Sequence, residues 1–546
     1  MEFAVALLSK LIVHLPTFGA PPGNATLRAN CLALQSTVAI ENTMILDASY
    51  LPAPSWATPK LTTLGTCGAS APYSVPLCRV QFHTNTSATS GLSGEMWLPD
   101  EWNGRFMGVG NRGLDGCIRY DDLDYMTAQH YATVGTNNGH DGDTVRSFLN
   151  NPDSAIDFAS RAVHIEAVVG KQLVEAYYAR PPAYSYFSGC STGGRQATQA
   201  ALKHPDDFDG ILAGAPAIDF NHLIFWSGIL TRHIGAPDPT SPSFIPLASW
   251  KLIGDEVLRQ CDALDGIKDG IITEPDACDF RPESLLCSTD TPSKNKFCLT
   301  LPQVEALLKI YSPLYGTAGE LLYPRFDPGA EKSPLLPYLF GGQFFPLTEE
   351  WLKYVVFNDT DYTVQDYGLE QLALIDAVNP GDIASFSGDL SAFRNRGGKF
   401  LAYHGRADSI IPSGISKRFY NLIARTHSQA TLDAFYRLFL IPGMDHCDIP
   451  APGASAPGAA FRFGQTPNAL PPISANANSN SSLGSESAAK SESAPHDILA
   501  ALVSWVEHGT APDVIVGTAA DGATRAHCRY PMRSVWNAGA GWVCVE

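Results

Sequence analysis

The apolar and polar residues between about 80 and 215 follow patterns that alternate between strands and helices. Short apolar runs such as YSYFSG and FDGILAGAP are typical of buried strands, whereas SAIDFASRAVHIEAVVGKQLVEAYY repeats its apolar residues at helical spacing. The alternation returns after residue 394 with KFLAYHG, a helix around SKRFYNLIART, and FYRLFLIPG. Strands that alternate with helices favour a largely parallel sheet covered on both faces, so the pattern predicts an α/β fold.

The segment 217–394 departs from this alternation. It is rich in aromatic residues, prolines and expected loops, and it carries four of the twelve cysteines. A chain of 546 residues is too long for one compact core. We therefore interpret 217–394 as a large lid domain inserted into a core that consists of residues 23–216 and 395–546.

Two further segments differ from the globular pattern. Residues 451–492 are rich in Ala, Pro, Ser, Asn and Gly and lack the apolar residues that offset ordering entropy, so we expect a mobile loop there. Residues 1–22 are largely apolar, but Glu2 stands where a signal peptide usually carries a positive charge, and Lys10 interrupts the apolar stretch. A signal peptide and an N-terminal helix therefore both stay open.

The composition narrows the class of protein. The formal net charge of −18 repels phosphate backbones and anionic lipid, so nucleic acids and membrane surfaces are poor candidate partners. No apolar run of about 18 residues occurs, and we expect no membrane span. Twelve cysteines without a CxxC pair favour disulfides in an oxidising compartment over a zinc ribbon. Secretion as a glycoprotein also fits the four sequons at Asn24, Asn85, Asn358 and Asn480.

A GxSxG motif occupies residues 189–193 and places Ser191 between a predicted strand and the predicted helix RQATQAALKH. A serine on such a sharp turn needs small neighbours because its backbone is strained. The turn lifts the hydroxyl clear of the sheet, and the first amides of the helix point at a reacting carbonyl. We predict that Ser191 is a nucleophile, with an ordinary Gly-rich turn as the alternative.

A serine hydroxyl needs a base to take its proton. In α/β-hydrolases the partners follow in the order serine, acid, histidine, each after a later strand. Asp408 follows KFLAYHG and His446 follows FYRLFLIPG, so order and placement fit an orienting acid and a general base. We expect His404 to be a packed structural histidine and Asp445 to point elsewhere. The alternatives are a loop acid and a surface histidine.

Two cysteines flank the predicted catalytic residues. Cys190 precedes Ser191 and Cys447 follows His446. If the serine and the histidine touch, their neighbours come close as well, and a disulfide between them would tie the two loops together. The alternative is a reactive thiol at Cys190.

An acidic loop lies within the predicted lid. Asp262, Asp265 and Asp269 place three carboxylates within eight positions, and Gly266 and Gly270 allow tight turns. Hard cations bind several carboxylate and carbonyl oxygens, although the spacing is not that of an EF-hand. From these residues alone, a cation site and an acidic surface loop are both open.

The segments GCSTGGRQ, HGRAD and PGMDHC, together with CRVQF, NNGHDGDT, CDALDGIKDGI and HCRYP, give the chain a family resemblance. It resembles the tannase and feruloyl esterase family from the region of Cys31 to Cys544, and most of all its feruloyl (cinnamoyl) esterase B branch. The resemblance implies an α/β-hydrolase core with a Ser191, Asp408 and His446 triad.

The resemblance also implies an oxyanion hole. Its donors would be the backbone amides of Thr192 and Gly113. Family members often read GNGG in the second loop, whereas this chain has Arg112 in place of a glycine. That departure makes the loop conformation and the identity of the second donor open questions.

The disulfide pairing and a calcium site are further implications of the resemblance. Calcium would bind the side chains of Asp262, Asp265 and Asp269 and the carbonyls of Ile267 and Ile271, and it would staple the lid. No organic cofactor is implied. The implied disulfides are Cys190–Cys447, Cys31–Cys78, Cys67–Cys117, Cys261–Cys278, Cys287–Cys298 and Cys528–Cys544.

The function implied by the resemblance is hydrolysis of feruloyl, p-coumaroyl or caffeoyl esters of plant cell-wall polysaccharides by a secreted serine esterase. The alternatives are a tannase that cleaves galloyl esters, an esterase of other aromatic or synthetic esters, and a non-catalytic wall-binding glycoprotein. Five lid aromatics could line an acyl pocket, but we favour a role in the lid core for most of them: Phe340, Phe344, Phe345, Trp351 and Tyr354.

Overall fold

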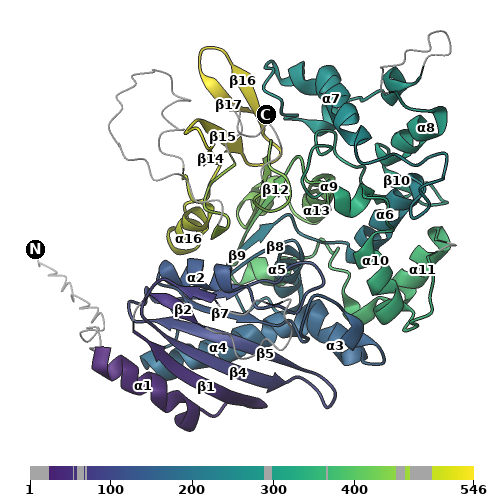
Figure 1. The fold of residues 1–546 in the computed structure, drawn as a ribbon. Helices are drawn as coiled ribbons and strands as arrows, with labels where there is room; N and C mark the ends of the chain where they lie inside the picture. The colour runs from purple at the N-terminus through teal and green to yellow at the C-terminus, as the bar shows by residue number, and fades with distance from the viewer. Residues whose placement is uncertain are drawn as a thin grey trace, which may run out of the picture.

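The computed structural model describes residues 24–52, 54–57, 67, 71–287, 298–364, 367–449, 461–467 and 495–546. A nine-stranded sheet forms its centre, with the strand order β1-β4-β5-β7-β6-β8-β9-β12-β13 (Figure 1). In chain order these strands are β1 (Thr43–Leu51), β4 (Leu77–Asn85), β5 (Gly91–Pro99), β6 (Arg105–Val109), β7 (Ala132–Thr136), β8 (Tyr184–Cys190), β9 (Gly210–Gly214), β12 (Lys399–Gly405) and β13 (Tyr436–Ile441).

The sheet has a parallel part and an antiparallel edge. The strands from β7 to β13 in the spatial order run parallel to one another. The strands β1, β4 and β5 pair antiparallel, and β5 pairs antiparallel with β7. The predicted parallel sheet is therefore present, and it is extended by a meander at one edge.

Both faces of the parallel strands are buried. Along β8 and β9, Phe187 and Ile211 belong to one apolar core, whereas their neighbours Tyr186 and Leu212 belong to the other. Successive side chains of a strand point to opposite faces, so a sheet covered on both sides needs apolar residues at every position. One face is covered by α1 (Asn24–Thr37), α4 (Ala162–Tyr178) and α5 (Thr192–Lys203), and the other by α2 (Tyr120–Ala128) and α16 (Ile498–His508).

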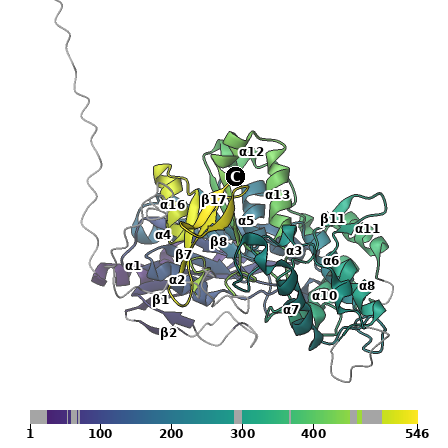
Figure 2. The same cartoon turned by 90° about the horizontal axis from the view of Figure 1, so that it is seen from above.

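The chain leaves the sheet after β9 and returns at β12. Within the described residues, nothing between these strands joins the nine-stranded sheet. Figures 1 and 2 show α6 to α11 of this excursion as teal and green helices beside the sheet, in the chain segment that we interpret as a lid. The α-helices described in this segment are α6 (Phe220–His233), α7 (Ser249–Cys261), α8 (Leu301–Ile310), α9 (Leu336–Phe340), α10 (Pro346–Trp351), α11 (Leu369–Val378) and α12 (Ser391–Asn395). The segment also contains a hairpin of β10 (Leu314–Tyr315) and β11 (Leu321–Tyr323).

The remaining elements lie around the core. No helix in the described part of the chain is long and apolar enough to cross a membrane. Short antiparallel pairs join β2 (Ser55–Ala57) with β3 (Ala71–Tyr73), β14 (Val514–Thr518) with β15 (Thr524–Cys528), and β16 (Arg533–Asn537) with β17 (Gly541–Val545). The helices after β12 are α13 (Gly414–Ala424), α14 (Gln429–Asp433) and α16, and a short helix α3 (Pro152–Ile156) precedes α4.

The predicted mobile loop at 451–492 needs a correction. Its stretch 461–467 is packed, because Phe461 and Phe463 are buried and Phe463 accepts a hydrogen bond from the amide of Ile498. Two phenylalanines in a polar segment are enough to anchor it locally. The rest of the predicted loop and the candidate signal peptide at 1–22 lie outside the described residues.

Candidate active site

The turn between β8 and α5 holds Ser191 in a strained conformation, with φ of 64° and ψ of −119°. This positive φ is rare for a residue with a side chain and marks the sharp turn that the GxSxG motif predicts. The Ser191 amide donates to the carbonyl of Gly214 (3.0 Å), and its carbonyl accepts from Ala217 (3.0 Å). The side chain stays partly exposed at the carboxyl end of the sheet.

Two glycines of the motif are required by close backbone approaches. A Cβ atom at Gly189 would lie 2.7 Å from the carbonyl carbon of Gly193. At Gly193 it would lie 3.1 Å from the carbonyl oxygen of Asn111, to which the Gly193 amide also donates (2.9 Å). The strand, the helix and the Gly-rich loop can therefore meet only if these side chains are absent.

The predicted acid and base form a hydrogen-bonded pair. The Nδ1 atom of His446 lies 2.7 Å from Oδ2 of Asp408, which is fully buried. Oδ1 of Asp408 accepts the amides of Ile410 (2.9 Å) and Ile411 (2.8 Å). Burial raises the pKa of Asp408, but the charges and hydrogen bonds of His446 and His404 outweigh it, so the pKa lies well below its usual value. A charged carboxylate of this kind fixes the imidazole and stabilises its protonated form.

His404 and Asp445 support the pair from either side. His404 is buried as expected, with Nδ1 bonded to the hydroxyl of Ser416 (2.7 Å), yet its Nε2 also lies 3.3 Å from Oδ2 of Asp408. The hydrogen bonds of the Asp445 carboxylate within the described residues are to groups other than the imidazole. Oδ1 of Asp445 accepts the backbone amides of His446 (2.8 Å) and of Ser409 (3.1 Å). Asp445 thus joins the acid loop to the histidine loop, which the sequence analysis did not foresee.

The Cys190–Cys447 disulfide joins the nucleophile turn to the histidine loop, with a Cα–Cα distance of 5.8 Å. No hydrogen bond links the Ser191 hydroxyl to His446 among the described residues, and the disulfide is the covalent link between the two segments that carry them. All twelve cysteines are paired. The pairs are the six that the resemblance implied: Cys31–Cys78, Cys67–Cys117, Cys190–Cys447, Cys261–Cys278, Cys287–Cys298 and Cys528–Cys544.

The loop expected to complete the oxyanion hole lies directly against the start of α5. The Thr192 hydroxyl donates to the carbonyl of Gly113 (2.5 Å), and Gly113 has a φ of 49°. Among the described residues, the amides of Thr192 and Gly113 donate no hydrogen bond, which is compatible with the expected oxyanion hole. The guanidinium of Arg112 lies near Asp122, with a distance of 3.8 Å between Nη2 and Oδ2.

Comparison with known proteins places the chain in a family. Residues 78–545 match the family model described as "Tannase and feruloyl esterase". The "Probable feruloyl esterase B-2" of Aspergillus flavus is 42% identical over 472 residues, which cover 84% of each chain. This chain is a member of the tannase and feruloyl esterase family.

Other members of the family agree over nearly the whole length. "Feruloyl esterase B" of Aspergillus niger is 38% identical and covers 95% of this chain and 96% of its own. The crystal structure of feruloyl esterase B from Aspergillus oryzae has a TM-score of 0.84 at 36% identity, with 95% of this chain and 100% of that chain covered. Tannin acyl hydrolase from Aspergillus niger, at 19% identity and a TM-score of 0.71, shares the fold.

The acidic lid loop has carboxylate oxygens of the kind that bind calcium ions. Each aspartate accepts one amide within the loop: Asp262 from Gly270, Asp265 from Ile267 and Asp269 from Ile271, at 3.0, 3.1 and 3.1 Å. Oδ2 of Asp269 is buried without a hydrogen-bond partner. Burial and the neighbouring carboxylates raise the pKa of Asp269 to about 6. A cation would satisfy this oxygen and neutralise the loop.

The acidic loop also lies beside the loops of the triad. A Cβ atom at Gly443, three residues before His446, would lie 3.1 Å from Cδ1 of Ile271. The buried guanidinium of Arg406, two residues before Asp408, donates to Asp276 (2.6 Å). The spacing along the chain gave no sign of this proximity, because it depends on contacts between segments that lie more than 100 residues apart in the sequence.

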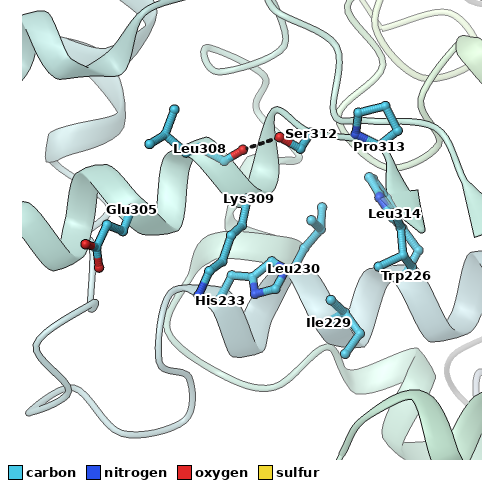
Figure 3. Close-up of a pocket in the computed structure, with 10 residues that line it drawn as sticks. All are labelled: Trp226, Ile229, Leu230, His233, Glu305, Leu308, Lys309, Ser312, Pro313 and Leu314. Carbon is cyan, nitrogen blue, oxygen red and sulfur yellow. Dashed lines mark hydrogen bonds between the residues drawn. The ribbon is translucent and has the colours of Figure 1, made fainter. Parts of the chain in front are cut away.

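A cavity of about 450 Å³ lies in the lid between α6 and α8 (Figure 3). It is lined by side chains such as Trp226, Leu230 and Lys309 and contains none of the predicted site residues. The lid aromatics are mostly core, as expected. The side chains of Phe340, Phe344, Phe345 and Trp351 are buried, and Tyr354 is partly buried.

The Asp408–His446 pair predicts the pH dependence of ester hydrolysis. Burial lowers the pKa of His446, but Asp408 outweighs it and the pKa lies above its usual value of 6.5. A general base must be neutral, so kcat/KM should fall as pH decreases through a midpoint above 6.5. Asp408→Asn should lower that midpoint and reduce kcat by about 10³–10⁴-fold.

The control for this pH profile is Asp521→Asn, because Asp521 lies on an exposed hairpin turn. Its profile should match that of the unaltered enzyme. A profile for Asp408→Asn with an unchanged midpoint would contradict the role of the pair.

The Cys190–Cys447 disulfide predicts a joint loss of stability and activity. It spans 257 residues, so the double variant Cys190→Ala/Cys447→Ala should lose about 4–5 kcal/mol of unfolding free energy and much of its kcat. The matched control is Cys287→Ala/Cys298→Ala, which opens a lid bridge spanning 11 residues and should leave kcat unchanged. Denaturant unfolding and steady-state kinetics measure both effects, and full activity without the first bridge would disprove its role.

Proposed function

We propose that this carboxylic ester hydrolase is a feruloyl esterase that cleaves hydroxycinnamoyl esters, such as those of ferulate, p-coumarate and caffeate. One observation carries the proposal: the buried Asp408–His446 pair is joined through the Cys190–Cys447 disulfide to a strained serine turn. The acyl group follows from the relatives named feruloyl esterase B. The natural substrate would be feruloylated plant cell-wall polysaccharide.

The proposed reaction is acyl transfer in two stages. His446 takes the Ser191 proton as the hydroxyl oxygen attacks the ester carbonyl, and the amides of Thr192 and Gly113 bind the oxyanion. His446 then returns the proton to the leaving alcohol. Water repeats these steps on the acyl-enzyme and releases the hydroxycinnamate. Asp408 stabilises the imidazolium in both stages.

We also propose that the protein is secreted. Six disulfides form and persist in an oxidising compartment, and the chain has no unpaired cysteine. The sequon residues Asn85 and Asn358 are exposed, as glycosylation requires, although Asn358 also exchanges hydrogen bonds with Asn150. Asn480 lies outside the described residues, and Asn24 begins α1.

We further propose that the acidic lid loop holds a structural calcium ion. Asp262, Asp265 and Asp269 would supply carboxylates, and Ile267 and Ile271 would supply carbonyls. Among the described residues, the carboxylates of Asp262, Asp265 and Asp269 do not all lie within 4.8 Å of one another. Calcium would therefore draw them closer together. The ion would hold the lid against the loops that carry Asp408 and His446.

A substrate panel tests the main proposal. Purified enzyme should hydrolyse methyl ferulate, methyl p-coumarate and methyl caffeate with higher kcat/KM than methyl gallate. Ser191→Ala should reduce turnover by at least about 10³-fold while the circular dichroism spectrum stays unchanged, because only the nucleophile is removed. A strong preference for methyl gallate would instead identify a tannase, and turnover retained in Ser191→Ala would place the nucleophile elsewhere.

Calcium removal tests the lid site. EDTA treatment followed by dialysis should lower Tm, and Ca²⁺ should restore it, because an ion bound only to the folded state adds about 3–4 kcal/mol at 100–1,000 times its Kd. Asp269→Asn should abolish this response to Ca²⁺. A Tm that does not change on calcium removal and addition would contradict the site.

A further inference from the structure

Two histidines and an aspartate meet near the amino end of β9, whereas Ser191 follows the carboxyl end of the neighbouring strand β8. His164 lies on α4, His204 follows the last residue of α5, and Asp207 precedes β9. One ligand atom of each lies within 4.8 Å of the others. Because α5 starts beside Ser191 and has twelve residues, it carries the chain about 18 Å from the nucleophile before His204.

The donor chemistry of this cluster suits a transition-metal ion. Two imidazole nitrogens and one carboxylate oxygen form a ligand set that Zn²⁺ uses in sites with an open fourth position. Nδ1 of His164 lies 2.9 Å from Oδ2 of Asp207. Asp207 is buried, whereas both histidines are partly exposed, so water could complete the coordination sphere.

Some charges around the cluster favour a bound cation, and others oppose it. The carbonyls at the C-terminal end of α5 favour a cation beside His204. The ammonium of Lys171 opposes one, although it donates to the backbone carbonyl of Asp207 and not to the carboxylate.

We propose that His164, His204 and Asp207 form a binding site for one Zn²⁺ ion. The two imidazole rings are stacked, with centroids 4.1 Å apart and planes 12° from parallel. A metal ion lies in the plane of each imidazole that binds it, so Zn²⁺ requires one of the rings to rotate out of the stack. The bound ion would cross-link α4 to the turn between α5 and β9.

The test is isothermal titration of the full-length enzyme with Zn²⁺, after EDTA treatment, dialysis and saturation of the lid loop with Ca²⁺. We expect one equivalent to bind and Tm to rise. The variants His164→Asn and His204→Asn should each weaken binding by at least about 10-fold, since each removes one of three protein ligands. His508→Asn, at an exposed histidine, is the matched control and should bind normally.

Ester hydrolysis provides the second readout. The variants should keep normal turnover, which shows that they fold, and Zn²⁺ at one equivalent should not inhibit the unaltered enzyme. Zn²⁺ that inhibits turnover and binds His204→Asn as tightly as the unaltered enzyme would place the ion at His446 and overturn the proposal. Absence of binding to the unaltered enzyme would overturn it as well.

Discussion

The Cys190–Cys447 disulfide is the constraint on which the rest of the site depends. In the sheet, β13 lies three strands away from β8, so the loops that carry His446 and Ser191 start about 14 Å apart. The histidine loop must therefore reach back across β9 and β12. Cys447 takes a positive φ of 63° in doing so, and the disulfide fixes the end of this reach beside the nucleophile turn. Asp408 follows β12, which lies between β9 and β13 in the sheet, and its carboxylate holds the imidazole of His446.

Residues between β9 and β12 also contact the two loops that carry Asp408 and His446. Ser333 in the lid donates to the carboxylate of Asp445, which also accepts the backbone amides of His446 and Ser409. Burial and the charge of Asp408 raise the pKa of Asp445 to about 6, and the hydrogen bonds from Ser333 and Ser409 oppose this shift. Arg406 adds an ion pair to Asp276. The segment between β9 and β12 thus contributes to the framework that holds the loops of Asp408 and His446.

The features that could be predicted from the sequence are those with a local signature. The GxSxG turn, the strands before Asp408 and His446 and the parallel order of the core follow from short patterns and chain order. The features that the sequence did not predict depend on contacts between distant segments. The antiparallel meander of β1, β4 and β5, the packing of Phe461 and Phe463, the role of Asp445 and the meeting of His164 with His204 are all of this kind.

The central claim is that the disulfide-linked loops make Ser191 the reactive hydroxyl of the molecule. An alkyl fluorophosphonate reacts with an activated serine and marks it covalently, so peptide mass spectrometry of the labelled protein locates the nucleophile directly. We expect one adduct per chain on the peptide that contains Ser191, and loss of labelling when Asp408 is changed to Asn. An adduct on another serine, or a protein that does not react, would contradict it.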